Sequence, residues 1–206
     1  MADVFEAIDL EDDEYEEYLS EMDTSYVAAM LGFMYTDDAV DVLNELDEDQ
    51  RESYLEMMDT ETVQEINELL AYPEYTAGAI MTTEYVSITE LSTVRSAMAV
   101  LRKKAPDAET IYYLFVVNDM HQLTGVLSLR DLIISDEDCL VRDIMSERVV
   151  SVNVSEDQEA VAHIIKDYNF LAIPVISDEK ELLGIITVDD IIDVIDEEAE
   201  DDYSKL

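Results

Sequence analysis

The sequence carries the same pattern twice after residue 80, and this repeat restricts the possible folds more than any other feature. Ile80-Met81 returns as Ile144-Met145 64 residues later, and Gly125 returns as Gly184 59 residues later. The second spacing is smaller because the first copy has a longer segment at residues 105–110. A repeat of this length indicates two copies of one supersecondary unit.

Each copy alternates strands with a helix. Apolar residues at helical spacing predict one amphipathic helix per copy, with a polar cap before it. Runs of β-branched and aromatic residues predict the strands. The expected helices are residues 93–104 and 158–168, the expected strands are 86–88, 113–117, 150–152 and 172–176, and the copies close with glycine-led segments at 125–131 and 184–190.

Residues 1–72 read as short helices instead. Polar clusters that resemble helix caps recur about every twelve residues, each before a run with helical apolar spacing; they are Asp23-Thr24-Ser25, Thr36-Asp37, Asp47-Glu48-Asp49 and Asp59-Thr60. A helix this short cannot bury its apolar stripe alone, so we expect the helices to stack into a small superhelix. Tyr72-Pro73 ends the region, because proline disfavours helix in the residue before it.

The charge is extreme and unevenly distributed. The chain has 52 acidic and 11 basic residues and a net charge of −41. Residues 1–79 hold 25 acids and a single base, Arg51, and nine of the fourteen residues at 189–202 are acidic. Nucleic acid and anionic membranes are therefore poor partners, whereas divalent cations and basic proteins are suitable ones. A halophile-type surface is the alternative, but it would scatter acids over every exposed face.

Other classes of protein receive little support. Cys139 is the only cysteine, so a disulfide framework is excluded and a reducing compartment is expected. The chain shows no signal peptide and no apolar run of the ~18 residues that span a bilayer. His121 and His163 lie near no nucleophile motif, and a Walker loop and an EF-hand loop are both absent. We therefore expect a protein that is not an enzyme.

The end of each copy resembles the signature of cystathionine-β-synthase (CBS) domains. Gly-x-x-Ser/Thr-x-x-Asp occurs as Gly125, Ser128 and Asp131, and again as Gly184, Thr187 and Asp190. The match extends to the cytosolic region of MgtE-type magnesium transporters, which the chain resembles over essentially its whole length. The segments that carry this resemblance are 72–82, 106–113, 125–131 and 184–193 with the acidic tail after it.

The resemblance implies an α+β multi-domain chain. An all-α superhelical N domain at 1–72, shorter than a full family N domain, is followed by a tandem pair of α/β CBS domains at 73–138 and 139–188. An acidic connecting helix at 189–206 would lead to a transmembrane pore domain that is absent from this chain. The expected setting is the cytoplasmic face of the cell membrane, and the expected partners are this pore and a second copy, bound through the CBS domains, but no nucleic acid.

In the family, Mg²⁺ bridges the N domain, the CBS domains and the connecting helix and favours the closed channel. Carboxylates suit this hard cation, which keeps several waters and takes one or two protein ligands. Matching by motif gives the candidate metal ligands Asp37, Asp41, Glu159, Asp190, Asp193, Asp201 and Asp202. Asn169 stands where the family commonly has an aspartate, so that position would bind a cation more weakly or not at all.

Two further hypotheses compete with magnesium sensing. CBS pairs hold adenine nucleotides between their copies, and the positions that match the family's ATP-binding pattern are Tyr113, Arg130, Asp131 and Phe170. The carboxylate of Asp131 would accept hydrogen bonds from ribose, Arg130 would supply charge, and the two aromatic rings would flank the base. The third hypothesis is a structural adaptor that binds a basic partner.

Overall fold

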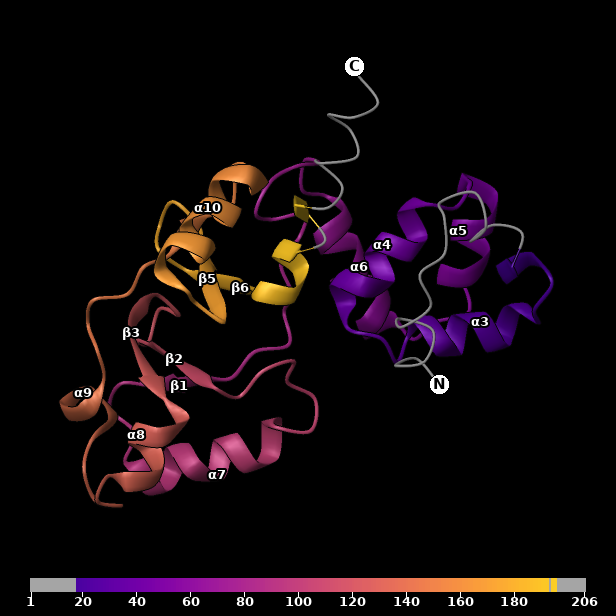
Figure 1. Ribbon diagram of the computed structural model, residues 1–206. Helices are drawn as coiled ribbons and strands as arrows, with labels where there is room; N and C mark the ends of the chain where they lie inside the picture. Colours follow the sequence, from indigo (N-terminus) through magenta and orange to yellow (C-terminus); the bar gives the residue numbers. More distant parts are fainter. Residues whose placement is uncertain (1–17, 193, 196–206) are drawn as a thin grey trace. The chain divides into compact units, whose positions relative to one another are not determined.

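The computed structural model describes residues 18–192, 194 and 195. The chain forms two compact units, residues 1–72 and residues 73–206 (Figure 1). Asp193, Asp201 and Asp202, three of the predicted metal ligands, lie outside the described residues.

The described part of the first unit is helical with a twelve-residue repeat, as predicted. Its helices are α3 (Thr24–Leu31), α4 (Thr36–Asn44), α5 (Glu48–Leu55) and α6 (Thr60–Leu70). Asp23, Asp47 and Asp59 cap α3, α5 and α6 with their carboxylates, which satisfies the first amides of each helix. The start of α4 differs from the prediction, because Tyr35 is its N-cap and makes no side-chain cap bond.

Alternate helices pack together in this unit, α3 on α5 and α4 on α6. Leu31, Leu43 and Ile66 are fully buried. The single base of the region, Arg51, has a structural role: its Nε donates to the carbonyl of Leu43 at 2.8 Å, at the C-terminus of α4. A guanidinium suits this place because a helix C-terminus carries partial negative charge.

The second unit contains two sheets of the same design. The first has β1 (Ser87–Thr89), β2 (Tyr113–Val117) and β3 (Leu123–Ser128), and the second has β4 (Val152–Asn153), β5 (Ala172–Ile176) and β6 (Leu182–Thr187). In each, the first strand runs parallel and the third antiparallel to the middle strand. Tyr113 pairs with Ser128 as Ala172 pairs with Thr187, so the registers are equivalent.

The helices of this unit also follow the repeat. The first copy contains α7 (Val94–Lys104) and α8 (Leu129–Ile134), with α9 (Val141–Ile144) after it, and the second contains α10 (Gln158–Tyr168). Residues 188–192, 194 and 195 are helical and correspond to α8. Figure 1 shows α7 and α8 beside the first sheet and α10 beside the second. The predicted helices and strands are present with boundaries that differ by one or two residues.

Reciprocal backbone bonds join the two copies around a pseudo-two-fold axis. The Leu123 N–H donates to the Lys180 carbonyl at 2.9 Å, and the Leu182 N–H donates to the His121 carbonyl at 3.0 Å. These bonds exchange when each residue is replaced by its counterpart 59 positions away. Gln122 forms a bridge with Glu181, which is its own counterpart, so the axis passes between these two residues.

A second set of reciprocal contacts lies at the two conserved-pattern glycines of the repeat. Thr82 exchanges two backbone hydrogen bonds with Ile185 at 2.8 and 3.0 Å, and Ser146 exchanges two with Val126 at 2.9 Å. A side chain at Gly184 would place Cβ 2.7 Å from the Thr82 carbonyl oxygen. Glycine is needed there because two backbones approach too closely for any side chain.

We predict that Gly184→Ala destabilises the protein more than Gly125→Ala. The new methyl group at Gly184 meets backbone 2.7 Å away, whereas at Gly125 the nearest atom is the Met145 sulfur at 2.5 Å, which belongs to a flexible side chain. Overpacking of this kind costs about 1–3 kcal/mol, with the larger cost where the neighbour cannot move. Urea unfolding of the two variants measures the difference, and equal losses would contradict the explanation.

Candidate functional site

Two carboxylates from different copies lie close together in the second unit. Asp190 is in the first turn of helix 188–195, and Glu109 is in the segment between α7 and β2. An oxygen of one lies within 4.8 Å of an oxygen of the other, and both side chains are half-buried. The orientation of Asp190 is fixed, because its Oδ2 accepts hydrogen bonds from the Thr187 N–H and hydroxyl, each at 2.8 Å. Carboxylate oxygens at this spacing are hard ligands of the kind Mg²⁺ prefers.

The other predicted metal ligands that the structure describes lie on helix first turns or one turn later. Glu159 is exposed in the first turn of α10, where its N–H donates to the carboxylate of Asp157 at 3.0 Å. In the first unit, Asp37 is in the first turn of α4 and is 6% exposed. Asp41 follows on the same helix and is exposed. Acids in a first turn are favoured by the helix dipole, so each has a local structural reason for its place.

The asparagine at position 169 has a backbone explanation. Asn169 ends α10 in the left-handed conformation, with φ 52° and ψ 43°, and its N–H donates to the carbonyl of Ile165. Asparagine tolerates this conformation better than most residues, which is why it commonly follows a helix C-terminus. The side chain is exposed and carries an amide oxygen without a charge.

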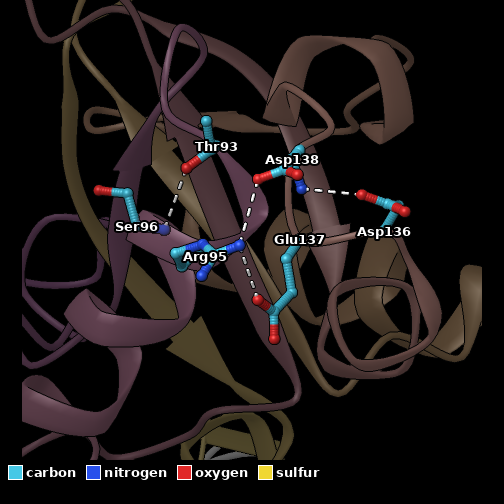
Figure 2. Close-up of polar contacts among 6 residues, drawn as sticks. All are labelled: Thr93, Arg95, Ser96, Asp136, Glu137 and Asp138. Atoms are coloured by element: carbon cyan, nitrogen blue, oxygen red, sulfur yellow. Dashed lines mark hydrogen bonds and ion pairs between the residues drawn. The ribbon is translucent and has the colours of Figure 1, made fainter.

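The first copy neutralises its own acids at the position equivalent to Glu159. Arg95, 64 residues before Glu159, stands in the first turn of α7. Its Nη2 lies 3.1 Å from a carboxylate oxygen of Glu137 and 3.2 Å from one of Asp138 (Figure 2). The Asp138 N–H donates to Asp136 at 2.9 Å, which orders the acidic loop around the guanidinium. One cation at the start of this helix therefore holds two following acids.

The predicted nucleotide-binding residues of the first copy lie together. Tyr113 begins β2 opposite Ser128, which is the N-cap of α8. The hydroxyl of Ser128 donates to Asp131 Oδ2 at 2.6 Å and accepts from the Asp131 N–H at 3.0 Å. Arg130 and Asp131 are both exposed on the first turn of α8. This arrangement presents a carboxylate, a guanidinium and a phenol ring within one short stretch of fold.

The fourth predicted nucleotide-binding residue, Phe170, belongs to the second copy. Its ring is half-buried and stacks on that of Tyr168, with centroids 5.3 Å apart and planes 4° from parallel. Phe170 also lines an apolar cavity of about 370 Å³ between α10 and helix 188–195, together with Leu171 and Ile192. The stacked pair offers an aromatic surface of the kind that flanks a nucleobase.

A buried tyrosine lies near the axis between the copies. The Tyr85 hydroxyl donates to the carbonyl of Leu182 at 3.1 Å and lies 3.3 Å from Nε2 of His121. Burial, assisted by the negative charge of Glu181, raises the pKa of Tyr85 to about 12. The phenol is therefore neutral at physiological pH and serves as a hydrogen-bond donor rather than as a base.

Two of these residues were not singled out from the sequence. Glu109 is one acid among 52, and only the fold brings it to within 4.8 Å of Asp190. Tyr168 has the position of a helix-end residue, and its stacking on Phe170 depends on the chain reversal at Asn169. The repeat itself was the usable signal, because it assigns Glu109 and Tyr168 to equivalent positions, each 16 residues before the glycine of its copy.

Within residues 18–192, 194 and 195, the structure contains no helix that combines the length and the apolar character needed to cross a membrane.

Comparisons with known proteins match the chain from end to end. The model of the MgtE intracellular N domain matches residues 1–75, and the model of the CBS domain matches residues 77–137 and 141–197. A protein named magnesium transporter MgtE, from Enterococcus faecalis, is 56% identical over 206 residues, which is 100% of this chain and 46% of that relative. The chain thus spans about half the length of this curated relative.

Two solved structures share the fold. The soluble part of a magnesium transporter is 56% identical, with a TM-score of 0.92 over 96% of this chain and 77% of that chain. The cytosolic domain of the Mg²⁺ channel MgtE in complex with ATP is 40% identical, with a TM-score of 0.89 over 94% of this chain and 78% of that chain.

Proposed function

Because the chain belongs to the MgtE-type magnesium transporter family, as an intracellular N domain followed by two CBS domains, we propose that it is the magnesium-sensing regulatory region of a magnesium channel. Mg²⁺ would bind between acidic groups of the N domain, the CBS domains and the connecting helix and so favour the closed state. The role is regulatory rather than enzymatic, and the region would work at the cytoplasmic face of a membrane.

The close approach of Glu109 and Asp190 carries this proposal. Two carboxylates about 5 Å apart repel each other by about 1 kcal/mol in water and about 3 kcal/mol at an effective dielectric constant of ~20. Both side chains are half-buried, with oxygens within 4.8 Å, so solvent screens them only partly. A divalent cation between them turns this repulsion into attraction, and it does so only in the arrangement that brings the two copies together.

The ion-pair network of the first copy supports the same reading of the second. Arg95 holds Glu137 and Asp138, and the sequence counterparts of these three residues are Glu159, Asp196 and Glu197. The second copy thus has a carboxylate where the first has a guanidinium, and acids where the first has acids. We propose that Mg²⁺ takes the part of Arg95 there.

The remaining predicted ligands extend this scheme to bridging between units. In the proposal, Asp37 and Asp41 of the N domain and Asp193, Asp201 and Asp202 of the connecting helix contribute further oxygens to shared magnesium sites. An ion that binds only the compact arrangement stabilises it by mass action, by about 2.7 kcal/mol at one hundred times its Kd. Loss of Mg²⁺ would leave the carboxylates to push the domains apart.

We predict that Glu159→Arg raises the thermal stability of the magnesium-free protein and reduces the further rise that Mg²⁺ produces. The new guanidinium would replace the ion as Arg95 does in the first copy. An exposed ion pair contributes about 0.2–1 kcal/mol, and 1 kcal/mol corresponds to roughly 2–4 °C for a chain of this size. Melting curves in EDTA and across a magnesium titration, at matched ionic strength, measure both effects.

Two variants control this experiment. Arg95→Glu should lower the stability in EDTA and enlarge the response to Mg²⁺, because it gives the first copy the charges of the second. Asp119→Arg makes the same change of charge in an exposed turn and should leave the response to Mg²⁺ as in the parent. A parent protein that K⁺ stabilises as well as Mg²⁺ does would favour a halophile-type surface instead.

A second candidate function, adenine nucleotide binding, rests on the residues around Asp131. The stacked Tyr168 and Phe170 rings offer a surface for a base, and Arg130 and Asp131 are exposed beside Ser128. The relative of known structure described as a complex with ATP supports this candidate. Mg²⁺ would assist, because the net charge of −41 opposes a bare triphosphate.

We predict that Arg130→Ala weakens ATP binding by at least about tenfold but changes adenosine binding little. The guanidinium would meet phosphate, and a hydrogen bond to a charged group contributes about 1.5–3 kcal/mol, whereas adenosine carries no phosphate. Calorimetry with both ligands measures the difference, and Arg148→Ala, another exposed arginine in a loop, is the control. Equal losses for both ligands would show that Arg130 does not contact phosphate.

The proposed homodimer has an apolar surface available to it. Ile133 and Ile134 on α8 are 63% and 74% exposed, and Ile192 and Ile195 on the equivalent helix are 51% and 42% exposed. Helix faces this apolar favour burial against another surface. We propose that a second copy of the chain covers them through the CBS domains and that the pore of the full-length transporter is the partner of the connecting helix.

A further inference from the structure

The pseudo-two-fold axis creates two equivalent positions for a ligand in the second unit. Each has a serine or threonine that ends a strand and an aspartate three residues later, Ser128 with Asp131 and Thr187 with Asp190. In each pair the hydroxyl donates to the aspartate Oδ2, at 2.6 Å in the first and 2.8 Å in the second. The backbone therefore offers the same ribose-type carboxylate twice.

The side chains around these two carboxylates differ at every chemically decisive place. Residues 59 positions apart are equivalent, and the reciprocal bonds of Leu123 and Leu182 show that the fold obeys this spacing. Around Asp131 the equivalent set is aromatic or basic: Tyr113, Arg130, Tyr168 and Phe170. Around Asp190 it is small, acidic or aliphatic: Ala172, Asp189, Glu109 and Ile111.

The position at Asp131 suits a nucleotide for separate reasons. Aromatic rings stack on a base, with the Tyr168 and Phe170 planes only 4° from parallel. Base stacking of this kind contributes to binding whatever the base, because every base has a π face. An exposed arginine next to the aspartate supplies the charge and the planar fork of donors that phosphate requires.

The position at Asp190 lacks each of these features. Asp189 replaces the arginine with a negative charge, and Glu109 places a second carboxylate within 4.8 Å of Asp190. Ala172 is 5% exposed and offers a methyl group where Tyr113 offers a ring. The Asp190 Oδ2 also accepts from both the N–H and the hydroxyl of Thr187, so it has less capacity for ribose.

We propose that the two equivalent positions have diverged, so that the chain binds one adenine nucleotide, at Asp131, and that Asp189 and Glu109 exclude nucleotides from the position at Asp190. The inference rests on the proposed nucleotide binding and adds its stoichiometry and the residues that set it. Asp189 and Glu109 act here as specificity-determining residues, because their charges oppose phosphate where Arg130 attracts it.

Calorimetry with ATP in magnesium-containing buffer tests the proposal on the unmodified chain. The expected stoichiometry is one nucleotide per chain, and Asp131→Asn should abolish it. The double variant Asp189→Arg, Glu109→Gln removes the excluding charges and should bind a second, weaker nucleotide. Asp119→Arg, which changes the charge of an exposed turn by the same two units as Asp189→Arg, should keep a stoichiometry of one.

The outcomes separate this inference from the function beneath it. Two nucleotides per unmodified chain would overturn the exclusion and leave nucleotide binding standing. A double variant that folds, by circular dichroism, and still binds one nucleotide would overturn the assignment to Asp189 and Glu109. A chain that binds no ATP at all would overturn nucleotide binding and, with it, this inference.

Discussion

The reciprocal backbone bonds between the two CBS copies are the constraint on which the rest of the second unit depends. Leu123 bonds to Lys180, and Leu182 to His121, while Gln122 meets its own counterpart Glu181. A backbone bond is specific in register, so each strand of one copy is fixed against the other to within a residue. Glu109 of one copy and Asp190 of the other come together because of this fixed register.

On this near-symmetric backbone, charge is what distinguishes the two halves. The first copy holds an acidic pair with Arg95 and carries Arg130 beside Asp131, whereas the second has Glu159 and Asp189 at the same places. Two exchanges of a base for an acid change the ligands that the copies favour without changing the fold. We interpret the first copy as adapted to an anionic nucleotide and the second as adapted to a divalent cation, the ligand that a chain with a net charge of −41 attracts most readily.

The sequence predicted most of the architecture because the signals are local. Aspartate caps gave the twelve-residue helical repeat, and the recurrence of Gly125 as Gly184 gave two copies with equivalent strands. The cap of α4 was placed one residue late, since Tyr35 ends an extended segment without any capping side chain. Helix and strand patterns are periodic properties of neighbours in the chain, and they are legible for that reason.

The candidate site was predictable only in part, because it depends on contacts between the copies. Motif positions led to Asp190 and Asp131, but no periodicity shows that Glu109 lies within 4.8 Å of Asp190. The left-handed backbone at Asn169 gives that residue a role in ending α10, which a comparison of ligand types alone does not reveal. Sequence identifies which acids match a motif, and the fold decides which of them face a common ion.

The most direct test of magnesium bridging is the distance between the two units. Spin labels at Glu52→Cys and Glu179→Cys, both exposed, in a Cys139→Ser background would report it by pulsed electron resonance. The account predicts a shorter and narrower distance distribution in Mg²⁺ than in K⁺ at the same ionic strength. Identical distributions in the two salts would contradict it.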